Sequence, residues 1–234
     1  MTPPSHVLFD LDGTLTDSAP GIVGSLRQAF ATEGVDLPTE EVLLQAIGPP
    51  FELGLPAIGV PPGRVSAVIS RYRERYEHVG LFENRLYDGV VEMLDTLGAA
   101  GVVLAVATAK PEPLARRIVE HFGLADRFVV LAGATYEGLP GRRTKTEVVA
   151  YALAELGITG GPGVVMVGDR DHDVLAAREH GLVSIGVRWG YGSVEELTNA
   201  GADALAADPA EVVSLVTTTA RSTRMGDVFG ARPS

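Results

Sequence analysis

The sequence predicts an α/β fold, a doubly wound parallel sheet of about five strands with a small all-helical cap inserted into it. Short β-branched runs alternate with longer helical segments, which is the pattern of βαβ units. The runs are almost continuously apolar, as expected for parallel strands buried on both faces. One long interruption after the first run leaves room for the cap. The chain of 234 residues is long enough for a large domain with such an insertion.

Five segments carry the strand pattern, and single helices separate the later ones. The strands are expected at Val7–Phe9, Val102–Val106, Phe128–Leu131, Val164–Val167 and Val183–Val187. The helices between the later strands are expected at Pro111–Phe122, Lys145–Leu156 and Asp173–His180, each ending near a glycine.

The stretch between Phe9 and Val102 is much longer than one crossover helix requires. Within it the helical pattern falls on Ala19–Glu33, Glu40–Ile47 and Arg64–His78, and the crossover helix falls on Val90–Ala100. We therefore expect a helical cap over residues 16–86 and an α/β catalytic core made of residues 1–15 and 87–216. Residues 217–234 lack apolar periodicity and are expected to form a frayed tail.

Composition excludes several classes of function. With 30 acidic and 19 basic residues the formal net charge is −11, which argues against a nucleic-acid polymer or an anionic membrane as the main partner. The chain has no cysteine, so a disulfide framework, a thiolate zinc site and a thiol nucleophile are excluded. Neither a signal peptide nor a membrane span is visible, and a cytoplasmic protein is expected. The sequence leaves the oligomeric state open.

Polar residues follow the apolar runs at the strand ends, where open α/β sheets bind their ligands. They are Asp10 and Asp12 after the first run, Thr108 and Lys110 after the second, Lys145 after the third, and Asp169 and Asp173 after the fourth. A lone aspartate there is commonly a helix cap or a turn residue. The conjunction of all of them at one edge of the sheet favours a functional site.

Carboxylates gathered at one point repel one another unless a cation joins them. An oxygen-rich site without thiols or clustered imidazoles suits Mg²⁺. We predict that Asp10 and Asp169 bind the metal. Asp173 is expected to lie behind these ligands, where the helix dipole also favours it.

These residues, in this order, resemble the four motifs of the haloacid dehalogenase superfamily of phosphohydrolases. The motifs are Asp-x-Asp-Gly-Thr at Asp10, Thr108, Lys145, and Gly-Asp-x-x-x-Asp at Gly168, and the resemblance covers residues 7 to about 205. The second acid, Asp12, is typical of the phosphatase and phosphotransferase branches. A helical insertion after the first motif resembles the subgroup of phosphoglycolate phosphatases and 5′-nucleotidase-like enzymes.

The resemblance implies a role for each site residue. Asp10 is the nucleophile that forms an aspartyl phosphate, and Asp12 is the general acid and base. Mg²⁺ is bound by Asp10, Asp169 and the backbone oxygen of Asp12. The phosphate is held by Thr108, Lys145 and backbone N–H groups, with Ala109 among them. The expected substrate is a small phosphorylated metabolite, phosphoglycolate-like or a nucleoside monophosphate.

Three residues are candidates for substrate specificity. Pro49 and Phe51 belong to a Gly-Pro-Pro-Phe segment of the cap that could present an aromatic ring to the site, although a plain turn with Phe51 in the cap core fits equally well. Arg142 precedes Lys145 in a loop and could contact substrate or simply be solvated. In the cap, Tyr72 and Tyr76 are spaced i,i+4, which indicates helix packing rather than a binding groove.

Two alternatives to a phosphatase remain. A phosphotransferase or phosphomutase would use the same aspartyl phosphate and return the phosphoryl group to a hydroxyl of another molecule. A phospho-accepting signalling module also combines acids, a threonine and a lysine on a parallel sheet, but its phosphorylated aspartate follows the third strand and its chain is shorter. The phosphatase hypothesis fits the order of the residues best.

Overall fold

The computed structural model contains a six-stranded parallel sheet in the order β5-β4-β1-β6-β7-β8. The strands are β1 (His6–Phe9), β4 (Val103–Pro111), β5 (Val130–Ala134), β6 (Val164–Gly168), β7 (Val183–Val187) and β8 (Ala204–Ala206). The structure describes residues 4–44, 46–48, 51–136 and 139–226, with side chains described as far as residue 217. The predicted doubly wound α/β fold is confirmed.

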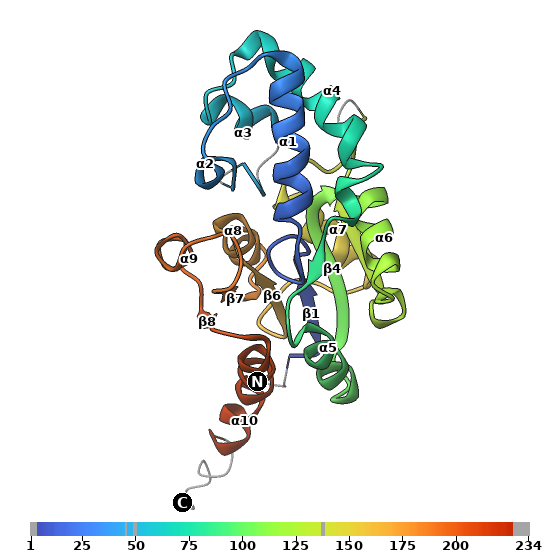
Figure 1. The fold of residues 1–234 in the computed structure, drawn as a ribbon. Coiled ribbons are helices and arrows are strands. Elements are labelled where there is room, and N and C mark those ends of the chain that lie inside the picture. The colour runs from blue at the N-terminus through green and yellow to red at the C-terminus, as the bar shows by residue number, and fades with distance from the viewer. Residues whose placement is uncertain (1–3, 45, 49–50, 137–138, 227–234) are drawn as a thin grey trace, which may run out of the picture.

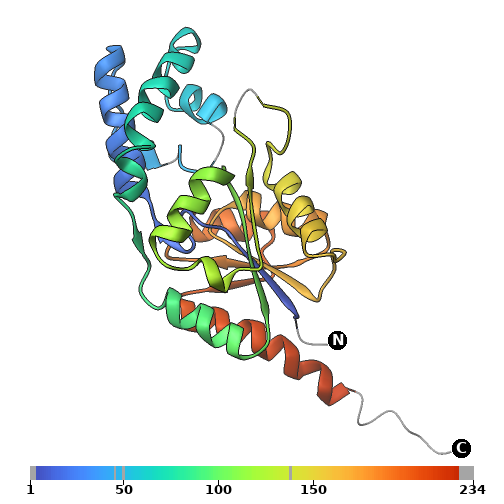
Figure 2. The same cartoon turned by 90° about the vertical axis from the view of Figure 1, so that its right-hand side faces the viewer.

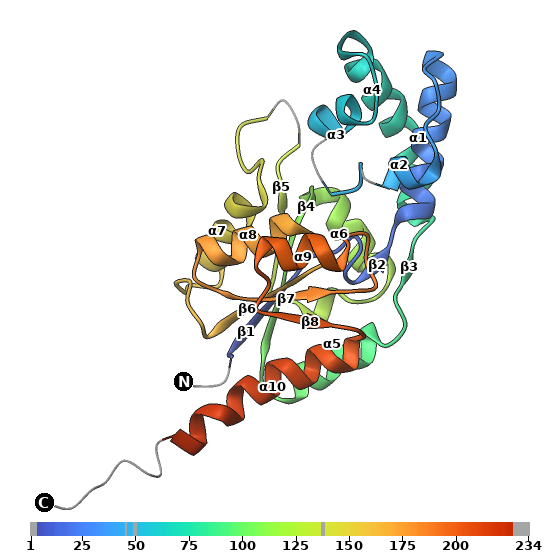
Figure 3. The ribbon, with the colours of Figure 1, turned by 90° about the vertical axis from the view of Figure 1, so that its left-hand side faces the viewer.

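The central strand β1 shows how the sheet is covered on both faces. Val7 and Phe9 pack in one apolar cluster with α5 (Val90–Ala99), α6 (Glu112–His121) and α10 (Pro209–Gly226). Leu8 points the other way and packs with α7 (Lys145–Glu155) and α8 (Asp171–Glu179), because neighbouring side chains of a strand face opposite sides. Helices α5 and α10 lie side by side under the sheet (Figure 2), and α7, α8 and α9 (Val194–Ala200) cover the opposite face (Figure 3).

A second group of helices stands above the carboxyl edge of the sheet (Figure 1). It contains α1 (Ala19–Glu33), α2 (Glu40–Leu44), α3 (Phe51–Ala57) and α4 (Val65–Tyr76), with short 3₁₀ turns at Pro62–Arg64 and Gly80–Phe82. The chain enters through β2 (Thr16–Asp17) and returns through β3 (Arg85–Leu86), which pair antiparallel. Both connections therefore pass through one two-stranded ribbon, and we call the segment between them the cap.

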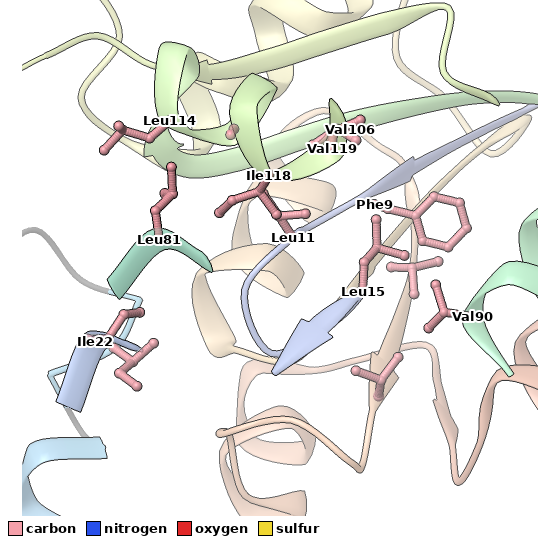
Figure 4. Close-up of a cluster of buried hydrophobic side chains, with 14 of the residues drawn as sticks. Phe9, Leu11, Leu15, Ile22, Leu81, Val90, Val106, Leu114, Ile118 and Val119 are labelled. Carbon is pink, nitrogen blue, oxygen red and sulfur yellow. The ribbon is translucent and has the colours of Figure 1, made fainter. Parts of the chain in front are cut away.

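The cap and the sheet share one apolar cluster. Figure 4 shows Phe9, Leu15 and Val90 at the sheet end of this cluster, and Ile22 and Leu81 at the cap end. All five side chains are almost fully buried. Burial of this kind stabilises at roughly 25 cal/mol per Å² of apolar surface, so the shared cluster attaches the cap to the sheet.

Several elements differ from the sequence predictions. Strand β5 begins at Val130 instead of Phe128, and its buried part is Ala132–Ala134. Strand β8 and helices α3, α9 and α10 were not predicted. The tail predicted from Thr217 is instead helical to Gly226, because no proline or glycine interrupts α10 before its last residue. Within the described residues, every helix is too short or too polar to cross a lipid bilayer.

Candidate active site

The loop after β1 places Asp10 and Asp12 at the carboxyl edge of the sheet. The backbone N–H of Asp10 donates to the carbonyl of Val167 on β6 at 2.9 Å, and Asp10 is buried. The chain then turns at Gly13, whose φ of 83° lies in the left-handed region. A Cβ atom on Gly13 would stand 2.2 Å from Oδ2 of Asp169, so glycine is required both for the turn and for the approach of this carboxylate.

Asp169 follows β6 and is completely buried. Its Oδ1 accepts a hydrogen bond from the Thr14 hydroxyl at 3.3 Å, and its Oδ2 accepts one from the backbone N–H of Tyr191 at 2.8 Å. Burial, followed by the charges of Asp173 and Asp10, raises the pKa of Asp169 to about 7. A cation beside Asp169 would therefore favour its carboxylate form at neutral pH.

Lys145 supplies one cation to this cluster. It is the first residue of α7, where Thr144 and Glu147 form a reciprocal capping box, and its side chain is 2% exposed. Its Nζ lies 2.8 Å from Oδ1 of Asp10 and 2.7 Å from Oδ1 of Asp173, and it donates to the carbonyl of Ala107 at 3.0 Å. Burial alone would lower the pKa of Lys145, but the two carboxylates raise it above its ordinary value, so the ammonium form persists.

The end of β4 contributes Thr108, Ala109 and Lys110. Thr108 is 1% exposed, and its hydroxyl accepts a hydrogen bond from the backbone N–H of Lys110 at 3.2 Å. The Lys110 ammonium lies 2.6 Å from Oδ2 of Asp12 and 5.0 Å from the ring centre of Tyr76. The sequence singled out Lys110 without a role, and the structure pairs it with Asp12.

Two carboxylate groupings could hold a metal. Asp10, His172 and Asp173 offer ligand atoms within 4.8 Å of one another, but Lys145 already makes ion pairs with both acids there. The grouping that the sequence predicts is Asp10, Asp12 and Asp169, and in the structure the charge of Asp10 helps to raise the pKa of Asp169. Oδ1 of Asp12 is buried and has no hydrogen-bond partner among the described residues. This oxygen donor set fits Mg²⁺.

A cavity of about 380 Å³ lies between the cap and the carboxyl edge of the sheet. Its floor includes Asp10, Asp12, Thr108, Ala109 and Lys110. Phe51, the first residue of α3, lines its cap side, whereas Pro49 lies outside the described residues.

Arg142 is directed away from this cavity, which corrects its place among the specificity candidates. It pairs with Glu112 at 2.7 Å, donates to the carbonyl of Gly133 at 2.8 Å, and stacks on Tyr151. The neighbouring Arg143 lines the cavity instead. Neighbouring side chains in a loop point in different directions, and the sequence alone does not show which of the two arginines faces the site.

Of the aromatic residues that line the cavity, the sequence indicated Phe51 as a site residue but not the three tyrosines described next. Tyr72 and Tyr76 are buried against their neighbours, as their spacing indicated, but they also line the cavity. Tyr191 lines it too, and its hydroxyl accepts a hydrogen bond from the N–H of Ala19 at 2.9 Å and lies 3.2 Å from Oδ1 of Asp17. It therefore joins the loop after β7 to the start of the cap. The only sequence signal for Tyr72 and Tyr76 was their i,i+4 spacing, which places both on one face of a helix.

The comparisons with known proteins agree with this geometry. The family of haloacid dehalogenase-like hydrolases matches residues 7–187. A tyrosine-protein kinase PtkA of Mycobacterium tuberculosis is 45% identical over 192 residues, which are 82% of this chain but 65% of the relative. A 5′-nucleotidase of Pseudomonas aeruginosa is 39% identical over 82% of this chain and 86% of its own length. The crystal structure of a predicted phosphatase from Clostridium acetobutylicum superposes with a TM-score of 0.86 at 36% identity, covering 93% of this chain and all of the other.

Proposed function

Since the chain belongs to the haloacid dehalogenase-like hydrolases, we propose that it is a Mg²⁺-dependent phosphomonoesterase that forms an aspartyl phosphate on Asp10. One observation carries the proposal. The buried Asp10 carboxylate lies on the cavity floor beside the Lys145 ammonium, and a second acid, Asp12, lines the same cavity two residues further along the chain. A nucleophile and a separate proton donor are what phosphomonoester hydrolysis requires.

Asp10, Asp169 and the backbone oxygen of Asp12 are the groups that would hold the metal. Bound there, Mg²⁺ supplies positive charge to the carboxylates and to the phosphate oxygens. The raised pKa of Asp169, to which the charge of Asp10 contributes, supports this assignment.

The residues of this chain divide the reaction into two steps. In the first step an oxygen of Asp10 attacks phosphorus, the bond to the leaving oxygen breaks, and Asp12 gives that oxygen a proton. In the second step Asp12 takes a proton from a water molecule, which attacks phosphorus and releases Asp10 and inorganic phosphate. Lys145, the Thr108 hydroxyl and the backbone N–H of Ala109 hold the remaining phosphate oxygens.

Lys110 orients Asp12 in this scheme. Their ion pair of 2.6 Å fixes the position of the Asp12 side chain at the cavity.

Aspartate variants test the two roles by intact-protein mass spectrometry after mixing with p-nitrophenyl phosphate. Asp12→Asn keeps the nucleophile and lacks the base, so a covalent phosphate is expected to persist on the protein. Asp10→Asn is expected to carry none. The reverse result would overturn the assignment of nucleophile and acid.

The proposed substrate is a small phosphorylated metabolite, phosphoglycolate-like or a nucleoside monophosphate. The name 5′-nucleotidase of the Pseudomonas relative supports the second class. We propose that Phe51 and the cap wall read the part of the substrate beyond the phosphate, since the floor residues reach only phosphate and metal. Phosphate release from a panel that includes 2-phosphoglycolate and nucleoside monophosphates tests this assignment.

A phosphotransferase is the second candidate. The relatives named tyrosine-protein kinase favour it at 45% identity, although this chain spans about 65% of their length. The same aspartyl phosphate would then pass its phosphoryl group to a hydroxyl instead of to water. Radiolabelled ATP separates the two outcomes, because label recovered on a protein tyrosine supports transfer and label recovered as inorganic phosphate supports hydrolysis.

A further inference from the structure

Three aromatic side chains of the cap form one wall of the cavity above Asp12. The rings of Tyr72 and Tyr76 are stacked, with centres 4.9 Å apart and planes 15° apart. Phe51 stands almost perpendicular to Tyr72, with centres 4.6 Å apart and an interplanar angle of 83°. All three residues line the cavity. We call them the aromatic corner, because the ring of Phe51 meets the ring of Tyr72 at nearly a right angle.

The hydroxyl of Tyr76 lacks a hydrogen-bond partner among the described residues. Tyr76 is 2% exposed, and its Oη is one of the few buried side-chain oxygens in this condition. Burial, and next the charge of Asp12, raises the pKa of Tyr76 well above its ordinary value, so the hydroxyl remains a donor. A buried donor left unsatisfied costs free energy, which an acceptor on a bound molecule would recover.

The exposed surface of the cavity is mostly apolar, although charged side chains, among them Glu52, Glu77 and Arg143, also line it. Ile22, Ile47 and Leu114 line it beside the aromatic corner. Lys110, the cation beside Tyr76, is already paired with Asp12. A flat ring bound beside these residues would meet aromatic side chains, whose pairing prefers offset-stacked or edge-to-face contacts.

We propose that the aromatic corner binds a planar aromatic ring carried by the leaving group of the phosphomonoester, and that the Tyr76 hydroxyl donates to an acceptor on that group. The proposal rests on the proposed function in one respect, that the phosphate lies at Asp10. The volume of about 380 Å³ is near the lower end of the roughly 300–1,000 Å³ typical of ligand pockets. Either the base of a nucleoside monophosphate or the phenol ring of O-phosphotyrosine has this chemistry.

Binding to an inert variant tests the proposal without depending on turnover. Asp10→Asn in the full chain with Mg²⁺ is titrated calorimetrically with AMP, ribose 5-phosphate, O-phosphotyrosine and O-phosphoserine. The members of each pair differ in the aromatic ring. We expect the aromatic member of at least one pair to bind about tenfold more tightly, equivalent to about 1.4 kcal/mol. The pair with the larger ratio identifies the source of the ring, and ratios below about twofold in both pairs would overturn the proposal.

Three further variants locate the effect within the cavity. Each variant is added to Asp10→Asn. Tyr72→Leu is expected to bring the ratio of affinities for the aromatic and non-aromatic ligands close to one. Phe51→Leu is expected to reduce this ratio while the stacked rings of Tyr72 and Tyr76 stay in place. Tyr76→Phe is expected to lower the affinity for the aromatic ligand about fivefold more than the affinity for the non-aromatic member of the pair, which is within the range of one hydrogen bond. Tyr151→Leu is the matched control, because Tyr151 stacks on Arg142 outside the cavity.

The outcomes are distinguishable from failure of the proposed function. Should the wild-type chain release no phosphate from any substrate while the binding preference holds, the hydrolase assignment fails and the aromatic site stands. Two results would show that the aromatic corner is not the binding site. In the first, Tyr151→Leu changes the aromatic preference as much as Tyr72→Leu does. In the second, Tyr72→Leu and Phe51→Leu both keep the preference although circular dichroism shows that they are folded.

Discussion

Replacing Lys145 by methionine removes a buried cation while keeping a side chain of similar length. The ammonium lies within 2.8 Å of carboxylate oxygens of Asp10 and Asp173, and the three side chains are only 2%, 7% and 2% exposed, respectively. Solvent therefore screens this cluster little. Breaking a buried ion pair by removing one partner costs about 3–5 kcal/mol, because the remaining charge is left uncompensated. We expect Lys145→Met to lower the free energy of unfolding in EDTA by about this amount.

Urea unfolding followed by circular dichroism measures the loss. For a chain of this size each kcal/mol corresponds to about 2–4 °C in Tm, so a fall of roughly 6–20 °C is expected. Arg27→Met is the matched control. Arg27 pairs with Glu40 at the surface, where the side chains are 47% and 64% exposed, and its loss should cost less than about 1 kcal/mol.

A second change isolates the electrostatic cause. Adding Asp173→Asn to Lys145→Met removes one of the two orphaned charges and is expected to recover part of the lost stability. An electrostatic cause is refuted when Lys145→Met lowers the free energy of unfolding no more than Arg27→Met does. It is also refuted when Asp173→Asn lowers that free energy further.

Three other predictions concern the metal and the cap. Turnover should stop in EDTA and return with Mg²⁺, and excess Ca²⁺ should inhibit because its larger and more flexible coordination shell displaces the nucleophile; phosphate release that continues in excess chelator would contradict the metal assignment. Because the pKa of Asp169 is raised to about 7, Mg²⁺ must displace a proton below that pH, so calorimetry should show weaker binding at pH 6 than at pH 8, and equal affinities would argue against Asp169 as a ligand. Phe51→Ala should lower kcat/KM for the preferred substrate about tenfold relative to acetyl phosphate with little change in Tm, since Phe51 is only partly buried; a parallel loss for both substrates together with a lower Tm would assign Phe51 to cap packing.

The sequence predicted the elements whose apolar pattern is strong and missed those without one. Strands β1 and β6 are mostly runs of large apolar residues, and β7 alternates such residues with Ser184 and Gly186. All three lie within one residue of their predicted bounds. Strand β8 is three residues long and carries two alanines, so it has no hydrophobic signal of its own. Helix α3 contains Gly54 and Pro56, residues that are unfavourable in helices, and only its tertiary setting makes it helical.

The candidate site divides in the same way. Short motifs at strand ends indicated Asp10, Asp169 and Lys145, because the parallel topology brings every strand end to one edge. The pairing of Lys110 with Asp12 joins residues 98 positions apart and has no local signature. Likewise, the spacing of Tyr72 and Tyr76 gives a shared helix face but does not reveal that the face borders a cavity.

The ribbon of β2 and β3 has a consequence for how this architecture can change over evolution. Since Thr16 lies opposite Leu86, the chain leaves and re-enters the sheet domain at a single point. The cap is therefore one long loop whose two ends are held together by the ribbon. Closing a flexible loop becomes costlier only by about 0.6 kcal/mol for each doubling of its length. The length of an insertion at this point can thus change at little cost in loop closure, as long as apolar side chains such as Ile22 and Leu81 still pack in the cluster shared with the sheet. The part that meets the substrate is then free to diversify while the phosphate chemistry below it is retained.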